Sequence, residues 1–212
     1  MARRPTFTTV LLVRHGVTTT TGTILPGRAP GLHLAPRGTT QATQVAERLR
    51  GLANKPVALY VSPLERTRET AAPIAKALGL RATVERGLLE ADFGTWTGKK
   101  LSVLSAKPEW RAVQHAPSTF RFPDGESFSE MQSRMWSTIE RLAAKHRNRT
   151  IVLVSHADPI KAVVTQAQGV PLDLFQRTVI SPCSISAIAF TDSTPVVLCV
   201  NNTGSLKELM PS

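Results

Sequence analysis

The chain has 212 residues, of which 42% are hydrophobic, and it carries a formal net charge of +11. This composition supplies enough apolar side chains for a sizeable core, and no apolar run has the length of a membrane span. Residues 1–9 are basic but lack the apolar core and cleavage site of a secretory signal, so we expect a cytoplasmic protein with no membrane partner. We expect residues 1–212 to form one domain.

The positive charge is concentrated in residues 1–100, which hold 15 Lys and Arg against 6 Asp and Glu. These basic residues are scattered singly and aromatic residues make up only 5% of the chain, which argues against a nucleic-acid-binding face. A small anionic ligand is the better interpretation. Cys183 and Cys199 show no metal-ligand spacing, which favours buried structural thiols and no metal site.

Short aliphatic and β-branched runs predict five core strands, at residues 8–13, 57–61, 151–154, 185–190 and 196–200. Segments with helical spacing of apolar residues lie between these runs. This alternation predicts an α/β fold, a three-layer sandwich in which helices flank a mainly parallel central sheet.

The helix boundaries are marked by capping and stop signals. After the second predicted strand, Ser62 and Glu65 have the spacing of a capping box, and Gly79 is expected to end that helix. A similar box, Ser127 with Glu130, predicts another helix start.

Three further segments complete the predicted organisation. A helix from Gly38 to Gly51 is expected between the first two strands, and one begins at Asp158 and Pro159 after the third. Residues 91–126 interrupt the alternation, and we interpret them as a small inserted cap over one end of the sheet.

Charged residues follow the ends of the predicted strands. Arg14 and His15 follow the first strand, Arg66 lies in the helix after the second, Glu90 precedes the cap, and His156 follows the strand at 151–154. Because ligands of parallel α/β sheets bind beyond the carboxyl ends of the strands, we expect these side chains to converge. Imidazole, guanidinium and carboxyl groups together are suited to phosphoryl transfer through a histidine, without a metal or another cofactor.

The ordered set of motifs resembles the histidine phosphatase superfamily, also called phosphoglycerate mutase-like. The similarity includes an actinobacterial branch whose members are labelled phosphomutases. It rests on the segments LVRHGVT, GR at 27–28, GTTQA at 38–42, SPLERTRETA at 62–71, LLEADFGTWTG at 88–98, FPDGES at 122–127 and SHADPIKAV at 155–163.

The resemblance implies a role for each catalytic candidate. His15 matches the nucleophile that becomes phosphorylated, with Arg14 and Arg66 on the phosphate oxygens. His156 matches the second histidine, and Glu90 matches the proton donor to the leaving group. We expect the cationic pocket to lower the pKa of Glu90 unless a bound phosphate dianion offsets it.

The expected substrate-binding residues also include Thr18, Thr21, Arg28 and Ser155. Thr21 stands where the family commonly has Asn, and Ala157 replaces the usual Gly after the second histidine.

Other side chains are expected to lie outside the chemistry. Arg68 is predicted on a helix surface, Lys161 facing solvent, and Asp92 as a loop cap; Phe93 and Trp96 are expected to pack the cap, and His33, His115 and His146 to be peripheral.

The resemblance leaves three functions open. The leading expectation is a phosphatase acting on a small phosphorylated metabolite, because mutases of this family are typically longer. The alternatives are a bisphosphoglycerate-dependent phosphoglycerate mutase or related phosphomutase, and a non-catalytic anion-binding scaffold. A homodimer is compatible with each of them.

Overall fold

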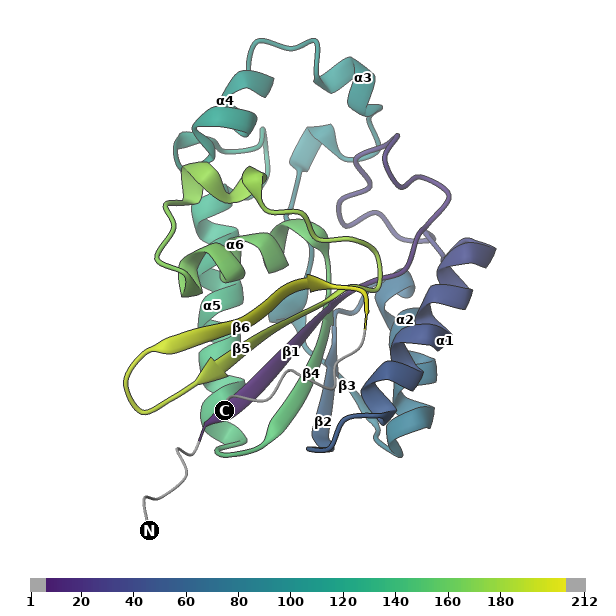
Figure 1. Ribbon diagram of the computed structural model, residues 1–212. Coiled ribbons are helices and arrows are strands. Elements are labelled where there is room, and N and C mark those ends of the chain that lie inside the picture. The colour runs from purple at the N-terminus through teal and green to yellow at the C-terminus, as the bar shows by residue number, and fades with distance from the viewer. Residues whose placement is uncertain (1–6, 205–212) are drawn as a thin grey trace.

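The computed structural model describes residues 7–204, and in this part of the chain six strands form one sheet in the order β3-β2-β4-β1-β5-β6 (Figure 1). The strands are β1 Thr8–Arg14, β2 Pro56–Val61, β3 Ala82–Val84, β4 Thr150–Ser155, β5 Ile185–Phe190 and β6 Pro195–Asn202. β1, β2, β3 and β4 pair in parallel, whereas β5 and β6 are antiparallel additions at one edge. The predicted mainly parallel α/β sheet is therefore confirmed.

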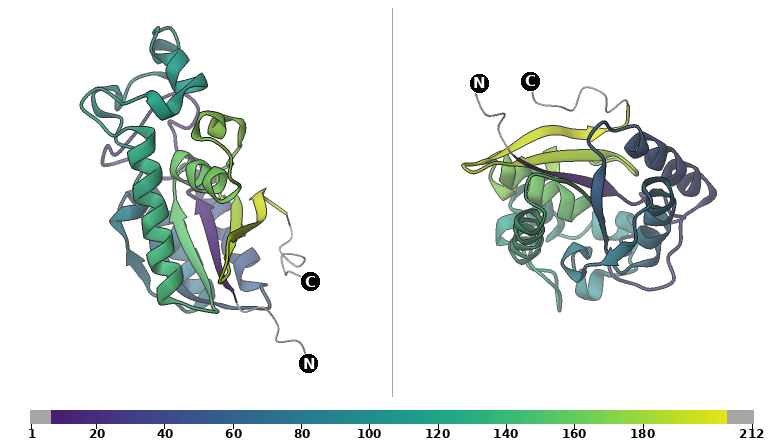
Figure 2. Two further views of the ribbon diagram at one scale, coloured as in Figure 1. Left: turned by 90° about the vertical axis from the view of Figure 1, so that its left-hand side faces the viewer. Right: turned by 90° about the horizontal axis from the view of Figure 1, so that it is seen from below.

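Alternating side chains of the strands build two separate cores. Leu11 and Val13 of β1 pack in a cluster with the helices at residues 36–50 and 65–78, whereas Val10 and Leu12 pack in a cluster with the helices at residues 128–145 and 157–167. Because successive strand residues face opposite sides, these helix pairs cover opposite faces of the sheet (Figure 2). The helices are α1 Pro36–Arg50, α2 Glu65–Leu78, α5 Phe128–Lys145 and α6 Ala157–Ala167.

Residues 91–126 contribute short helical segments at the carboxyl end of the parallel strands, at the top of Figure 1. They include α3 Leu101–Leu104, α4 Trp110–His115 and the 3₁₀ turns Gly94–Trp96 and Pro117–Thr119. A third apolar cluster fills this region, with Phe93 and Trp96 buried inside it as predicted. None of the described helices is long and apolar enough to span a membrane.

One of the two capping boxes is absent. Ser127 and Glu130 make both reciprocal hydrogen bonds at the start of α5, as predicted. At α2, however, the N-cap is Leu64 and makes no side-chain cap. The predicted Ser62–Glu65 box is wrong because Glu65 accepts from the Gly31 N–H and the Ser62 hydroxyl bonds to another side chain, described below.

Helix α6 begins at Ala157 with His156 at its N-cap, slightly earlier than the predicted start at Asp158. β3 was not predicted from the sequence, because a strand of three residues is too short to show an alternating pattern of apolar and polar side chains.

The turn after β1 lies against the start of α1 at a distance that only glycine permits. A Cβ atom on Gly38 would lie 2.1 Å from the Val17 carbonyl oxygen, and one on Gly16 would lie 2.6 Å from the Gly38 oxygen. Both contacts are to backbone, which cannot move aside cheaply. This packing fixes the path of the chain directly after His15.

We predict that Gly38→Ala lowers the free energy of unfolding, because the backbone overlap at ~1–3 kcal/mol exceeds the ~1 kcal/mol that Ala gains over Gly within a helix. Gly51→Ala, at the other end of α1, is the matched control, since its Cβ would meet nothing closer than 3.4 Å. Denaturant unfolding of both variants measures the difference. Equal stability of the two variants would contradict the steric argument.

Candidate functional site

The carboxyl ends of three parallel strands lie at one level. Arg14 pairs in register with Ser155. The His15 N–H donates to the Ser155 carbonyl at 3.0 Å, and the Ser62 N–H donates to the Val154 carbonyl at 3.0 Å. The strand ends therefore bring the residues after β1, β2 and β4 to a common edge, as the sequence predicted.

His15 is a buried, neutral imidazole with a defined free nitrogen. Its Nδ1 lies 2.7 Å from the Gly16 carbonyl oxygen, which can only accept, so Nδ1 carries the proton and Nε2 keeps its lone pair. Burial, together with the positive charges of Arg66 and Arg14, lowers the pKa of His15 to about 3. The ring therefore remains a potential nucleophile at neutral pH.

His156 lies beside it, with ring centroids 5.3 Å apart, and is fully buried. The Ser62 hydroxyl lies 2.8 Å from its Nε2, and its Nδ1 lies 4.0 Å from a carboxyl oxygen of Glu90. Burial, followed by the charge of Arg66, lowers the pKa of His156 well below its usual value. When Nε2 accepts the Ser62 proton, Nδ1 carries a hydrogen that it can donate.

Arg14 and Arg66 bring two guanidinium groups to the same edge. Arg14 Nη1 donates to the Ile180 carbonyl at 2.6 Å, and Arg66 Nη2 donates to the Gly27 carbonyl at 2.8 Å. Within the described residues, Arg14 Nε, Arg66 Nε and Arg66 Nη1 are buried without a hydrogen-bond partner. Buried, unbonded cationic donors are costly, and an oxyanion would satisfy them.

Glu90 holds a proton more tightly than an ordinary carboxyl group. Its pKa is raised to about 7 by burial and by the negative charge of Asp158, against the opposing charges of Arg66 and Arg14. Our expectation that the cations would lower this pKa is therefore wrong, because desolvation outweighs them. A protonated Glu90 can act as a general acid.

The Glu90 backbone is held by two arginines. Arg28 Nε donates to the Glu90 carbonyl at 2.8 Å, and Arg134 Nη2 approaches the same oxygen at 3.5 Å. Glu126 accepts from both guanidinium groups, at 2.9 Å from Arg28 Nη2 and 2.8 Å from Arg134 Nε. Arg28 is thus engaged with protein groups and is not part of the pocket lining, so its position does not support the expected substrate contact.

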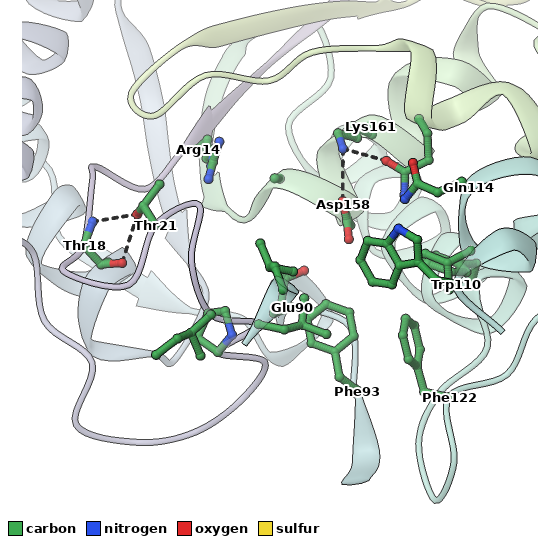
Figure 3. A pocket seen from close by; sticks show the side chains of 18 of the residues that line it. Arg14, Thr18, Thr21, Glu90, Phe93, Trp110, Gln114, Phe122, Asp158 and Lys161 are labelled. Carbon is green, nitrogen blue, oxygen red and sulfur yellow. Dashed lines mark hydrogen bonds and ion pairs between the residues drawn. The ribbon is translucent and has the colours of Figure 1, made fainter. Parts of the chain in front are cut away.

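Of the substrate-binding hydroxyl groups predicted after β1 and at the end of β4, only those after β1 line the pocket. Thr18 and Thr21 line the pocket, with their hydroxyl oxygens 3.0 Å apart (Figure 3). The Thr18 N–H donates to the Thr21 hydroxyl at 2.9 Å, which fixes this loop. Ser155 is fully buried and donates to the Leu88 carbonyl at 2.8 Å, so its hydroxyl is directed away from the expected substrate contact.

The pocket has a volume of about 290 Å³, just below the ~300–1,000 Å³ usual for ligand sites. Arg14, His15 and Glu90 lie at one part of it, and the remaining wall is largely apolar. That wall includes Ile24, Leu25, Pro26, Phe93, Leu101, Trp110, Val113, Phe122 and Phe128. The cavity therefore suits a small ligand with an anionic end.

Four polar residues of the pocket were not predicted from the sequence as site residues: Gln114, Asp158, Lys161 and Gln176. The prediction that Lys161 faces solvent is wrong, because its ammonium lies 3.3 Å from Asp158 Oδ1 and 3.0 Å from Gln176 Oε1. The spacing of Asp158 and Lys161, three residues apart in the first turns of α6, could have indicated a pair on one helix face. No local pattern indicates the two glutamines, which tertiary folding brings to the pocket.

The remaining candidates lie outside this pocket. Arg68 and His115 are exposed, His33 pairs with Glu69 on the surface, and His146 is half-buried against the Tyr60 hydroxyl. Asp92 accepts from the Gly94 N–H at 3.1 Å, as expected of a loop cap. Cys183 is buried, and Cys199 is half-buried. Among the described residues, no group of three or more His, Cys, Asp and Glu is arranged to hold a metal ion.

Comparison with known proteins identifies similar chains. Residues 10–203 match the family model described as histidine phosphatase superfamily (branch 1). Phosphoserine phosphatase 1 of Hydrogenobacter thermophilus is 33% identical over 187 residues, covering 86% of this chain and 88% of that protein. A protein of Erwinia tasmaniensis named "Probable phosphoglycerate mutase GpmB" is 35% identical over 182 residues, covering 84% and 83% of the two chains.

A similar fold is found among solved structures. A mutant of phosphoserine phosphatase from Entamoeba histolytica, in complex with phosphoserine, has a TM-score of 0.83 and 27% sequence identity to this chain. The match covers 94% of this chain and 99% of that structure.

We predict that the Glu90 carboxyl titrates near pH 7 and that Asp158→Asn shifts this titration to lower pH, since the variant removes a negative charge that raises the pKa. Carbon-13 NMR of labelled glutamate side chains, assigned with Glu90→Gln, measures the shift. Asp192→Asn, at an exposed site, is the control. A Glu90 signal that titrates near pH 4.5, or that Asp158→Asn leaves in place, would contradict the prediction.

Proposed function

The chain belongs to the histidine phosphatase superfamily, and we propose that it is a phosphatase that hydrolyses a small phosphomonoester through a phosphohistidine on His15. The observation that supports this most directly is the neutral His15 imidazole with its free Nε2, which lines the pocket together with Arg14 and lies near enough to the buried Arg66 for that charge to lower the His15 pKa. A nucleophile and donors for phosphate oxygens are thereby available together.

In the first step, the Nε2 lone pair of His15 forms a bond to phosphorus and the ester P–O bond breaks. The hydrogen bond from Nδ1 to the Gly16 carbonyl holds the ring in the tautomer that this attack requires. Arg14, Arg66 and Nδ1 of His156 donate to the phosphoryl oxygens as negative charge develops on them. Thr18 and Thr21 add hydroxyl groups at the same end of the pocket.

Glu90 supplies the proton that the leaving alkoxide needs. Its pKa of about 7 keeps a large fraction protonated at neutral pH. In the second step, water attacks the phosphohistidine, the ionised Glu90 takes a proton from that water, and the N–P bond breaks. Inorganic phosphate and neutral His15 are released, and Glu90 is again protonated.

A phosphomutase is the second candidate, supported by the similarity to the Erwinia tasmaniensis protein that carries the name of a phosphoglycerate mutase. It would use the same phosphohistidine but return the phosphoryl group to an organic acceptor instead of water. The two outcomes separate when inorganic phosphate and phosphorylated product are measured in the same reaction.

The substrate is a small phosphorylated metabolite, and the site of action is the cytoplasm. We propose neither a nucleic-acid nor a membrane partner for this protein, and a homodimer is compatible with the proposed function.

We predict that brief reaction with a radiolabelled phosphomonoester, followed by an alkaline quench, traps the phosphoryl group on His15. Peptide mapping locates the label. The His15→Ala variant should lose both label and turnover, whereas His33→Ala, at the surface, should keep both. Full turnover by His15→Ala would refute the covalent mechanism.

We predict that Glu90→Gln slows hydrolysis of an alkyl phosphate by ~10²–10⁴-fold, because the alkoxide then leaves without a proton. p-Nitrophenyl phosphate should lose far less, since p-nitrophenolate leaves readily unprotonated. Steady-state kcat for both substrates measures the difference. Asp92→Asn serves as comparison, and equal losses of Glu90→Gln on both substrates would remove Glu90 from the acid role.

A further inference from the structure

The pocket contains an ion pair on the side away from Thr18 and Thr21. Asp158 and Lys161 lie 3.3 Å apart, and their side chains are only 20% and 17% exposed. The Lys161 ammonium also binds Gln176 and lies 5.7 Å from the centre of the Phe175 ring. The positive charge of the Lys161 ammonium is therefore already stabilised by a carboxylate, an amide and an aromatic ring.

The charge balance of this wall disfavours a second anion on the ligand. The other charged residues in the pocket lining are Arg14, at the proposed phosphate end, and Glu90. A carboxylate on the leaving group would lie near the negative charge of Asp158, and Lys161 could bind it only by weakening an existing ion pair. Like charges brought together in a partly buried site are unfavourable.

The same wall is well suited to hydroxyl groups. Asp158 offers acceptor oxygens, and the amides of Gln114 and Gln176 can both donate and accept. The half-buried Trp110 ring packs on Trp96 with ring centroids 6.2 Å apart and forms an apolar wall beside them. In Figure 3, Asp158, Lys161, Gln114 and Trp110 all lie on the side of the pocket away from Thr18 and Thr21.

On the basis of the proposed function, we propose that the leaving group is an uncharged polyol or sugar whose hydroxyl groups bind Asp158 and the neighbouring glutamines. Asp158 thereby selects against leaving groups that carry a carboxylate. This specificity differs from that suggested by the names of relatives associated with phosphoserine and phosphoglycerate, whose organic parts carry a carboxylate.

Glycerol 3-phosphate and 3-phosphoglycerate form a matched test pair, because they differ only in whether one terminal carbon is a hydroxymethyl or a carboxylate. We expect kcat/KM of the wild-type protein to favour glycerol 3-phosphate by ~10-fold or more. Asp158→Asn should reduce this ratio by ~10-fold, since it removes the repulsive charge and keeps the shape. The ratio isolates specificity, because both substrates leave as alkoxides and depend on Glu90 alike.

Asp158→Ser provides a second variant that also lacks the charge, and Asp192→Asn is the control expected to leave the ratio unchanged. Melting temperature and p-nitrophenyl phosphate turnover verify that each variant is folded. A wild-type preference for 3-phosphoglycerate or phosphoserine, or an unchanged or larger ratio in both Asp158 variants, would overturn the inference. Absence of both p-nitrophenyl phosphate turnover and label on His15 would instead refute the proposed function.

Discussion

The burial of two guanidinium groups at the carboxyl end of the sheet is the constraint on which the rest of the site depends. Arg14 and Arg66 are held by backbone carbonyls, with donors left over that make no hydrogen bond within the described chain. Burial, reinforced by the charges of these two arginines, lowers the pKa of His15 and His156 and keeps both rings neutral. The close contact of Gly16 with Gly38 holds the turn after His15 in place.

Glu90 shows how the site reconciles that positive charge with a protonated acid. Two arginines would ionise a carboxyl group in an open pocket, but burial and the nearby Asp158 have the larger effect here. Arg28 and Arg134 bind the Glu90 backbone, and both donate to Glu126. These contacts fix the position of the acid through its backbone.

The sequence could predict the elements whose signals are local. Aliphatic runs marked the strands, and the order of motifs placed Arg14, His15, Arg66, Glu90 and His156 at one edge, where the structure has them. The sequence could not predict interactions set by distant partners. Ser62 appeared to be a helix cap but bonds to a histidine 94 positions away, and the pKa of Glu90 depends on burial that no short segment encodes.

The aromatic cluster of the cap also forms the pocket wall, because Phe93, Phe122 and Phe128 are buried core residues and line the cavity at once. Selection for substrate and selection for stability therefore act on the same atoms. Trp110 and Gln114 are less deeply buried and can be exchanged at lower cost to folding. Divergence toward new substrates within such a scaffold should thus proceed through α4, while the phenylalanine wall changes slowly.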